Sequence, residues 1–328
     1  MSSLVPDEVE EHYGTVMLQI TSGRVVPFLG AGANLCSRPD DSPWELGRYL
    51  PSGRELARYL AERFDYPFED KDDLGRVAQY ITVTSGSGPL YAELRGLFDL
   101  DYPPTSLHLF LAQLSSALRD KGYPVPGILV VTTNYDDIVE RAFKAVGEPF
   151  DVVTYIAEGE GRGKFLHFPP DADPCLIDKP NEYQGLPVDA SGMNPLRPVI
   201  LKLHGAVDRL APDRDSFVIT EDHYIDYLTR ADISSLVPVT LASKLRRSNF
   251  LFLGYSLRDW NLRVILHRIW GEQRLTFTSW AVQFRPDSLD RRFWRKRDVE
   301  IMDVALDDYV VELTKRLTAL QPRTEVRS

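Results

Sequence analysis

Two glycines separated by one alanine follow a short apolar run and could bind a phosphate group. The run Val-Val-Pro-Phe-Leu at residues 25–29 leads directly into Gly-Ala-Gly-Ala-Asn at residues 30–34, where the asparagine is placed to open a helix. Glycines permit a tight turn and close backbone approach, and the first N–H groups of a helix are free to bind an anion. Plain turns share this pattern, so the assignment depends on other parts of the chain.

Three further polar clusters come at the ends of later apolar runs. Thr-Asn-Tyr-Asp occupies residues 133–136, Leu-His-Gly residues 203–205, and Gly-Tyr-Ser residues 254–256. An asparagine carries both a donor and an acceptor, and a histidine that titrates near neutral pH can act as a general base. Asn134 and Asp136 would also serve as ordinary caps of a following helix. Catalysis and helix capping are compatible uses of these two residues.

The elements that must position these clusters alternate as strand and then helix. The unbroken run at residues 128–132 is typical of a strand buried on both faces of a parallel sheet. Further strands are expected at residues 24–29, 152–155, 199–203, 250–253, 278–283 and 299–303. We therefore expect an α/β fold with a Rossmann-like, doubly wound, mostly parallel sheet. Ligands bind at the carboxyl ends of such strands, so all four clusters are expected along one edge of the sheet.

A long helical excursion separates the first two strands. Apolar periodicity and capping signals, among them Ser-Gly-Arg-Glu at residues 52–55 and Thr105, predict helices at 7–22, 53–64, 72–83, 88–98 and 106–119. Residues 35–120 should thus form a helical layer or subdomain over the nucleotide edge. Residues 157–198 are rich in Gly, Pro and Asp and are interpreted as an irregular insertion. Later helices are expected at 221–230, 234–247, 260–270 and 306–320, and residues 1–328 are treated as a single domain.

The charge balance bears on the class of partner. The formal net charge of -10 argues against a protein built mainly to hold a nucleic acid backbone. Two basic segments, at residues 244–247 and 291–297, are interpreted as solvated helix faces. We expect no direct sequence-specific binding of nucleic acid. The 43% hydrophobic content can fill a sizeable core.

The two cysteines limit metal and redox chemistry. Cys36 and Cys175 are far apart, form no C-x-x-C pair and cannot build a four-cysteine zinc site. We therefore expect no metal. The N-terminus is acidic rather than signal-like, and no apolar run approaches the length of a membrane span. The sequence predicts a cytoplasmic protein without a membrane segment.

Taken together and in this order, the four clusters resemble the sirtuin superfamily, and in particular its bacterial NAD-cleaving branch in antiphage defence. Residues 30–34 are similar to the Gly-Ala-Gly-x-Ser/Asn phosphate loop, and residues 133–136 to the Gln/Thr-Asn-x-Asp motif. Lys-Leu-His-Gly at residues 202–205 resembles the strand end that carries the family histidine. Leu-Gly-Tyr-Ser-x-x-Asp at residues 253–259 resembles the form of the Gly-x-Ser turn found in the defence branch. The resemblance covers about residues 24–283.

The resemblance implies cleavage of the bond between nicotinamide and ribose in NAD, which builds positive charge at the anomeric carbon. It implies that Asn134 binds the ribose hydroxyls or a water, that Asp136 engages the nicotinamide carboxamide, and that His204 is the general base. The residues assigned to cofactor binding are Gly30, Ala31, Gly32, Ala33, Asn34, Thr133, Gly254, Ser256 and Asp259. His108 could face the same pocket from the third position of its helix. The remaining histidines are treated as structural or surface residues.

Departures from the deacylating sirtuins bear on the acceptor. The zinc module of those enzymes is missing, and the segment after the glycine loop lacks their Gly-x-Pro-Asp-Phe-Arg pattern. Both favour water as the acceptor, so we expect an NAD glycohydrolase that yields nicotinamide and ADP-ribose and depletes NAD in antiphage defence. Two alternatives remain open. One is an NAD-dependent protein deacylase or ADP-ribosyltransferase with an acceptor groove at residues 157–198, and the other is a non-catalytic NAD or ADP-ribose sensor.

Partners are implied by analogy. About 45 residues follow residue 283, which we interpret as too few for a fused sensor domain. The expectation is therefore a homo-oligomer that works with a separately encoded partner, such as an ATPase or an Argonaute-like sensor.

Overall fold

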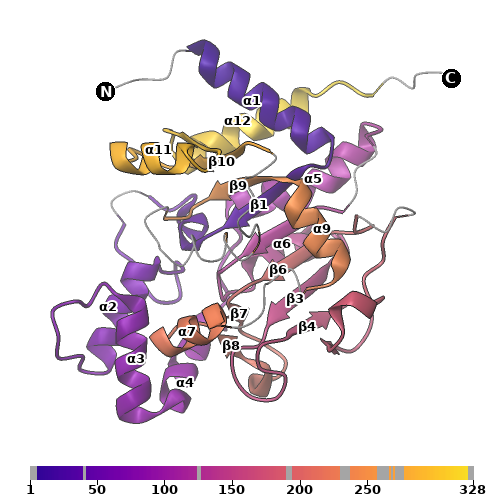
Figure 1. Cartoon of the computed structure of the whole chain (residues 1–328). Coiled ribbons are helices and arrows are strands. Elements are labelled where there is room, and N and C mark those ends of the chain that lie inside the picture. The colour runs from indigo at the N-terminus through magenta and orange to yellow at the C-terminus, as the bar shows by residue number, and fades with distance from the viewer. Residues whose placement is uncertain are drawn as a thin grey trace.

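The computed structural model describes residues 6–39, 42–123, 127–189, 194–229, 237–256, 266, 269 and 277–323. Its centre is a sheet in the order β11-β10-β9-β1-β2-β6-β3-β4-β5 (Figure 1). The strands from β11 to β3 in this order pair in parallel, which confirms the doubly wound, mostly parallel fold. Their bounds are β1 Val25–Leu29, β2 Leu129–Thr132, β3 Asp151–Tyr155, β6 Val199–Lys202, β9 Asn249–Leu253, β10 Ser279–Val282 and β11 Val299–Met302.

The direction of winding changes beside β1. β2, β6 and β3 lie on one side of β1, whereas β9, β10 and β11 lie on the other. The gap between the carboxyl ends of β1 and β9 is therefore a topological switch point, where open α/β sheets bind their ligands. The glycine loop at residues 30–34 follows β1 directly.

Helices cover both faces of the sheet. One face buries apolar residues of α1 (Pro6–Thr21), α5 (Ser106–Asp120), α6 (Ile138–Ala145) and α12 (Leu306–Ala319). The other face buries residues of α7 (Glu221–Thr229), α9 (Val239–Arg247) and α11 (Ser288–Arg295). The central strands are buried throughout, as is typical of parallel strands covered by helices on both faces.

The helical excursion forms a core of its own. α2 (Gly53–Arg63), α3 (Leu74–Ser85) and α4 (Ser87–Phe98) gather beside the sheet, with α7 against α3 (Figure 1). Their apolar cluster includes Tyr135 and Ile138, which follow β2. The predicted capping box of α2 is present: Ser52 Oγ accepts the Glu55 N–H at 3.3 Å, and Glu55 Oε2 accepts the Ser52 N–H at 2.8 Å. The excursion therefore packs onto the loop that carries Asn134.

The interpretation of residues 157–198 as irregular is wrong in part. β4 (Phe165–Phe168) and β5 (Cys175–Ile177) extend the sheet in antiparallel fashion beyond β3. In β4, Phe165 and His167 are buried, so buried and half-buried residues alternate along the strand. An alternation over only four residues is too short to be recognised in a segment rich in Gly, Pro and Asp. A short antiparallel pair of two-residue strands, β7 (Gly205–Ala206) and β8 (Ser216–Phe217), was likewise not predicted. Of the predicted helix 260–270, only Leu266 and Ile269 lie among the described residues.

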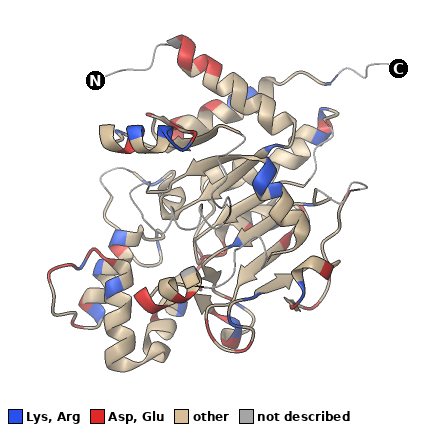
Figure 2. Ribbon diagram, in the orientation of Figure 1, with Lys and Arg blue, Asp and Glu red and all other residues tan. Residues whose placement is uncertain are grey.

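The two basic segments differ in environment. Lys244 on α9 is buried, and its Nζ donates to the Gly23 carbonyl at 2.5 Å, so this part of the solvated-face interpretation is wrong. Around α11 the basic residues are mostly exposed, and Arg291 pairs with Asp303 at 2.8 Å. Figure 2 shows acidic positions on α1 and α7 and basic positions on α9. None of the helices in the described part of the chain combines the length and apolar character needed to span a bilayer.

Candidate functional site

The four polar clusters lie at one edge of the sheet. β9, β1, β2 and β6 are consecutive neighbours, and each ends in one cluster: residues 254–256, 30–34, 133–136 and 203–205. Because these strands are parallel, their carboxyl ends share one edge. The predicted convergence of the four clusters at the strand ends is therefore confirmed by the topology.

The two glycine loops are in direct backbone contact. Gly32 N donates to the Gly254 carbonyl at 2.8 Å, and Gly30 N donates to the Leu253 carbonyl at 3.1 Å. A Cβ atom on Gly32 would lie 2.6 Å from the Gly254 oxygen. One on Gly254, whose φ is +66°, would lie 2.0 Å from Ala33 N. These positions therefore require glycine for loop-to-loop packing at the switch point.

This packing changes the expected phosphate cradle. The N–H groups of Gly30, Gly32 and Ala33 are all bonded within the protein, the last to the Gly30 carbonyl at 2.9 Å. Within the described residues, the Ala31 N–H is the one in this loop without an acceptor. Residues 31–35 form a short 3-10 helix (η1, Ala31–Leu35) rather than the start of a long helix at Asn34. The prediction that the whole loop offers N–H groups to phosphate was thus too broad.

Asn134 and Asp136 follow β2 and are both buried. Asn134 Nδ2 donates to the Gly30 carbonyl at 3.2 Å, and its backbone N donates to Thr132 Oγ1 at 3.0 Å. Asp136 Oδ1 accepts the N–H of Ile138, the first residue of α6, at 3.1 Å, although the N-cap residue of this helix is Asp137, while Oδ2 accepts from Asn34 Nδ2 at 2.8 Å. The Asn34 and Asp136 side chains thereby join the loops after β1 and β2.

A lysine beneath these residues was not singled out from the sequence. Lys202 on β6 is 1% exposed, donates to the Asp136 carbonyl, and pairs with Glu140 Oε1 at 2.8 Å. Burial raises the pKa of Glu140, although the Lys202 ammonium opposes that rise. The sequence does contain an indication that Lys202 has a special role, because this lysine interrupts the otherwise apolar run at residues 199–203. Lys202 therefore fixes the backbone that carries Asp136.

His204 lies just beyond β6 and is 4% exposed. The edges of two aromatic rings surround it, with centroids 5.5 Å away for Tyr224 and 5.8 Å for Tyr227. Its Nε2 is buried and makes no hydrogen bond to any described residue. Burial lowers the pKa of His204 to about 3. The expectation that it titrates near neutral pH was therefore wrong, and it is a neutral imidazole with an unused ring nitrogen.

A pocket that is partly open to solvent adjoins the Asn34 side of the site. Its lining includes Asn34, Arg38, Tyr49, Tyr102 and Thr105. The Arg38 guanidinium is held by Glu55 at 2.7 Å and by the Ser42 carbonyl at 2.7 Å, so the loop after η1 is tied to α2.

His108 is fully buried behind the pocket wall. Its Nδ1 accepts the Thr105 N–H at 3.3 Å in a capping box, and burial lowers its pKa to about 4.

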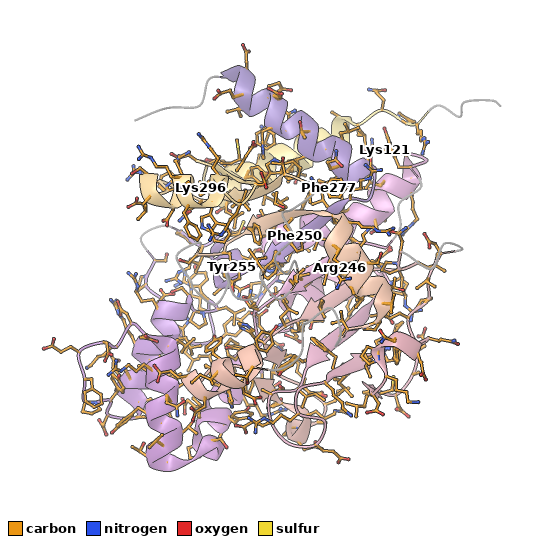
Figure 3. All side chains as sticks on the ribbon, viewed as in Figure 1. Lys121, Arg246, Phe250, Tyr255, Phe277 and Lys296 are labelled. Carbon is orange, nitrogen blue, oxygen red and sulfur yellow. The ribbon has the colours of Figure 1, made fainter. Side chains whose placement is uncertain are left out.

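The remaining predicted site residues are less constrained. Thr133 is half-buried and donates its N–H to the Leu29 carbonyl at 3.2 Å, whereas Ser256 is exposed. Tyr255, which is labelled in Figure 3, packs edge-on against Phe28, with the ring centroids 5.5 Å apart. Asp259 lies outside the described residues.

Comparison with known proteins defines the class. A family model described as a SIR2-like domain matches residues 128–302, which is more than half of the chain. The chain therefore belongs to the SIR2-like family, and the resemblance drawn from the four motifs is confirmed.

Curated relatives are similar at modest identity. The chain is 29% identical over 229 residues to "NAD(+) hydrolase ThsA" of Acinetobacter baumannii, covering 68% of this chain and 37% of that protein. It is 23% identical over 281 residues to "Defense-associated sirtuin 2" of Bacillus subtilis, covering 84% and 21%. It is 26% identical over 214 residues to "NAD(+) hydrolase ThsA" of Cytobacillus dafuensis, covering 65% and 34%. The chain thus spans between about a fifth and two fifths of these relatives.

Proposed function

We propose that this chain is an NAD glycohydrolase that cleaves the bond between nicotinamide and ribose and gives nicotinamide and ADP-ribose. The observation that carries the proposal is the neutral, buried His204, whose unused Nε2 lies at the same sheet edge as Asn134. The names of two similar proteins, both NAD(+) hydrolases, support the same reaction. The proposed site lies at the topological switch point, where dinucleotides bind in this fold class.

His204 and Asn134 are proposed to have different roles in the reaction. Bond cleavage builds positive charge on the ribose. A neutral imidazole can accept the proton of a ribose hydroxyl or of the attacking water, and it becomes an imidazolium when it does so. Asn134 Nδ2 is bound to the Gly30 carbonyl, and its Oδ1 accepts no hydrogen bond from any described residue. That oxygen can therefore orient a ribose hydroxyl or a water molecule. Catalysis is proposed to require both side chains.

Water is the proposed acceptor because the chain lacks the means to build a protein-substrate module of the deacylase type. Its two cysteines cannot form a four-cysteine zinc site. A defence role, in which NAD is depleted in the cytoplasm, is supported by the name of the Bacillus subtilis relative. Assembly into a homo-oligomer and control by a separately encoded sensor are parts of the same proposal.

The test is product analysis on three purified proteins: the wild type, Asn134→Ala and His204→Ala. We expect the wild type to convert NAD to nicotinamide and ADP-ribose without any peptide. His204→Ala should lower kcat by at least about 100-fold, the usual contribution of a general base. Asn134→Ala should also lower kcat, because it removes the group that orients the hydroxyl or the water. Melting temperatures and ADP-ribose binding show whether the variants keep their fold and site.

Two outcomes would contradict the proposal. Full activity in both variants would show that these residues are not catalytic. Nicotinamide release that depends on an acylated peptide would indicate a deacylase instead. If the wild type binds NAD without turnover, the assay is repeated with the products of neighbouring genes, and continued inactivity favours a sensor.

A further inference from the structure

A second pocket, partly open to solvent, lies at the opposite edge of the sheet from the four polar clusters. It is lined by Gly23, which precedes β1, by Ile128, which precedes β2, and by one side of α5. The clusters follow the carboxyl ends of these same strands, whereas Gly23 and Ile128 lie at their amino ends. The second pocket is therefore separate from the proposed NAD site.

A proline in β1 contributes to the shape of this pocket. Pro27 is one of its lining residues, and a proline has no backbone N–H to donate to a neighbouring strand. Each of the five residues of β1 is in register with β9, but the register with β2 begins only at Phe28. The amino ends of β1 and β2 are thus less tightly paired than their carboxyl ends, and the pocket lies beside them.

A buried lysine lies at this pocket without a carboxylate in contact with it. Lys244 is 6% exposed, and its Nζ donates to the Gly23 carbonyl at 2.5 Å and to Asn194 Oδ1 at 3.2 Å. An ammonium has three N–H donors, so one of them has no acceptor among the described residues. Burial lowers the pKa of Lys244 to about 8, and the more distant Asp189 opposes that shift. Lys244 is therefore a buried cation with an unused donor.

The wall of the pocket combines an unused hydroxyl with an apolar surface. Ser115 on α5 is 2% exposed, and its Oγ makes no hydrogen bond to any described residue. The other lining side chains are almost all apolar, among them Leu114, Leu118 and Leu251. Buried polar groups without partners are unfavourable, and a ligand that brings an acceptor removes that cost. The pocket thus suits a molecule that has one anionic end and an apolar remainder.

We propose that this pocket binds a monocarboxylic acid with an unbranched alkyl chain, whose carboxylate pairs with the Lys244 ammonium and whose chain lies against the apolar wall. A carboxylate supplies the counter-charge that the buried ammonium lacks. A phosphate or a dicarboxylate would bring a second charge for which the apolar wall has no partner. This site lies outside the proposed NAD site, and its test does not depend on NAD cleavage.

The test titrates the full chain with hexanoate, octanoate and octanol in a calorimeter. Octanol has the same chain length as octanoate without the charge, so comparing the two needs no variant. Lys244→Met removes the ammonium but keeps an unbranched side chain. Its matched control is Arg246→Met, which removes a charge from the exposed side of the same helix (Figure 3). Ser115→Leu places a larger apolar side chain in the pocket wall, and melting temperatures show whether each variant keeps its fold.

The wild type should bind octanoate at least about tenfold more tightly than octanol, the usual value of a hydrogen bond to a charged group. It should bind octanoate about fifteenfold more tightly than hexanoate, because each of the two additional methylenes contributes about fourfold. Lys244→Met should abolish the preference for octanoate over octanol, whereas Arg246→Met should preserve it. Ser115→Leu should weaken the binding of both ligands by at least about fivefold, because it overpacks the pocket.

Four results would overturn this inference. They are the absence of octanoate binding, equal binding of octanoate and octanol by the wild type, an unchanged preference in Lys244→Met, and unchanged affinities in Ser115→Leu. A competition experiment with ADP-ribose tests the location of the site. Octanoate that stays bound in excess ADP-ribose supports the separate pocket, whereas its displacement would assign the acid to the NAD site. The proposed NAD cleavage stands or falls independently of all these results.

Discussion

At the scale of single residues, His204 departs furthest from its ordinary chemistry. Burial disfavours the imidazolium and lowers its pKa to about 3, well below the usual value of 6.5. A base that is already neutral at pH 5 loses nothing when the pH falls from 8 to 5. The activity of the proposed site should therefore be insensitive to protonation of this residue over that range.

The expected pH profile of the activity follows from the lowered pKa of His204. A plot of log(kcat/KM) for NAD cleavage should show no acidic limb with a midpoint near 6.5, and a loss due to His204 should begin only as the pH approaches its pKa. Initial rates in buffers of constant ionic strength between pH 5 and 8 provide the measurement. A limb near 6.5 that is absent from the residual activity of His204→Ala would contradict the described burial.

Lys202 supports a second prediction at this scale. Lys202→Met should destabilise the protein by about 3–5 kcal/mol, because it leaves the Glu140 carboxylate buried without its counter-charge. The double variant Lys202→Met/Glu140→Leu should recover much of that loss, since it removes both charges and fills the space with apolar atoms. Urea unfolding of the three proteins gives the free energies. Equal losses in the single and double variants would show that Lys202 acts through its bond to the Asp136 carbonyl.

Sequence reasoning predicted the shared sheet edge of the polar clusters better than the state of their residues. Residues 134, 136 and 204 were predicted to lie at that edge because each follows an expected strand, and the strand order places them there. The environments of these residues could not be predicted. The burial of His204, for example, depends on Tyr224 and Tyr227 from α7, and no local sequence pattern reveals that contact. The bond from Asn34 to Asp136 joins residues that are distant in sequence, and it too was invisible.

At the scale of elements, the paired glycine loops give a matched test. Gly254→Ala should destabilise the protein by more than about 2 kcal/mol, because φ is +66° and the new Cβ would meet Ala33 N. Gly96→Ala, in the exposed face of α4 with nothing within 4 Å of the new Cβ, should stabilise it by about 0.5–1 kcal/mol. Denaturant unfolding of both variants measures the difference. A stable Gly254→Ala protein would contradict the described contact.

The elements themselves followed closely from the sequence where periodicity was long or hydrophobicity was continuous. The five helices from α1 to α5 and the central strands lie within a few residues of their predicted positions. β4 and β5 were missed because their stability comes from pairing beyond β3 rather than from their own composition. Asp151 at the start of β3 is fully buried, bonded to His167 at 2.8 Å and Arg197 at 2.5 Å, which ties β4 to β3. Such long-range ties leave no local pattern.

At the scale of the whole molecule, three buried histidines predict sensitivity to acid. Burial lowers the pKa of His12 to about 4, of His108 to about 4 and of His204 to about 3. The unfolded chain binds protons at these positions near pH 6.5, whereas the folded chain does not. The stability they contribute is therefore present above pH 6.5 and is lost as the pH falls toward 4 or below.

The expected slope is up to about 1.4 kcal/mol per pH unit for each histidine. Urea midpoints between pH 7.5 and 4.5 should fall steadily, and replacing His12 with Phe should make that fall shallower. His12 suits this test because it lies on α1 and its Nε2 contacts the hydroxyl of Tyr309 on α12 at 2.9 Å, away from the proposed site. An unchanged slope in the variant would show that His12 is protonated in the folded protein.

The contact between the two glycine loops also sets a condition on synthesis. Gly32 and Gly254 lie more than two hundred residues apart, and β9 must pair with β1 before Gly32 can donate to the Gly254 carbonyl. A chain emerging from the ribosome therefore cannot form this contact between the glycine loops until residue 254 has been translated. If the finished protein consumes NAD, nascent and prematurely ended chains remain harmless to the cell that makes them.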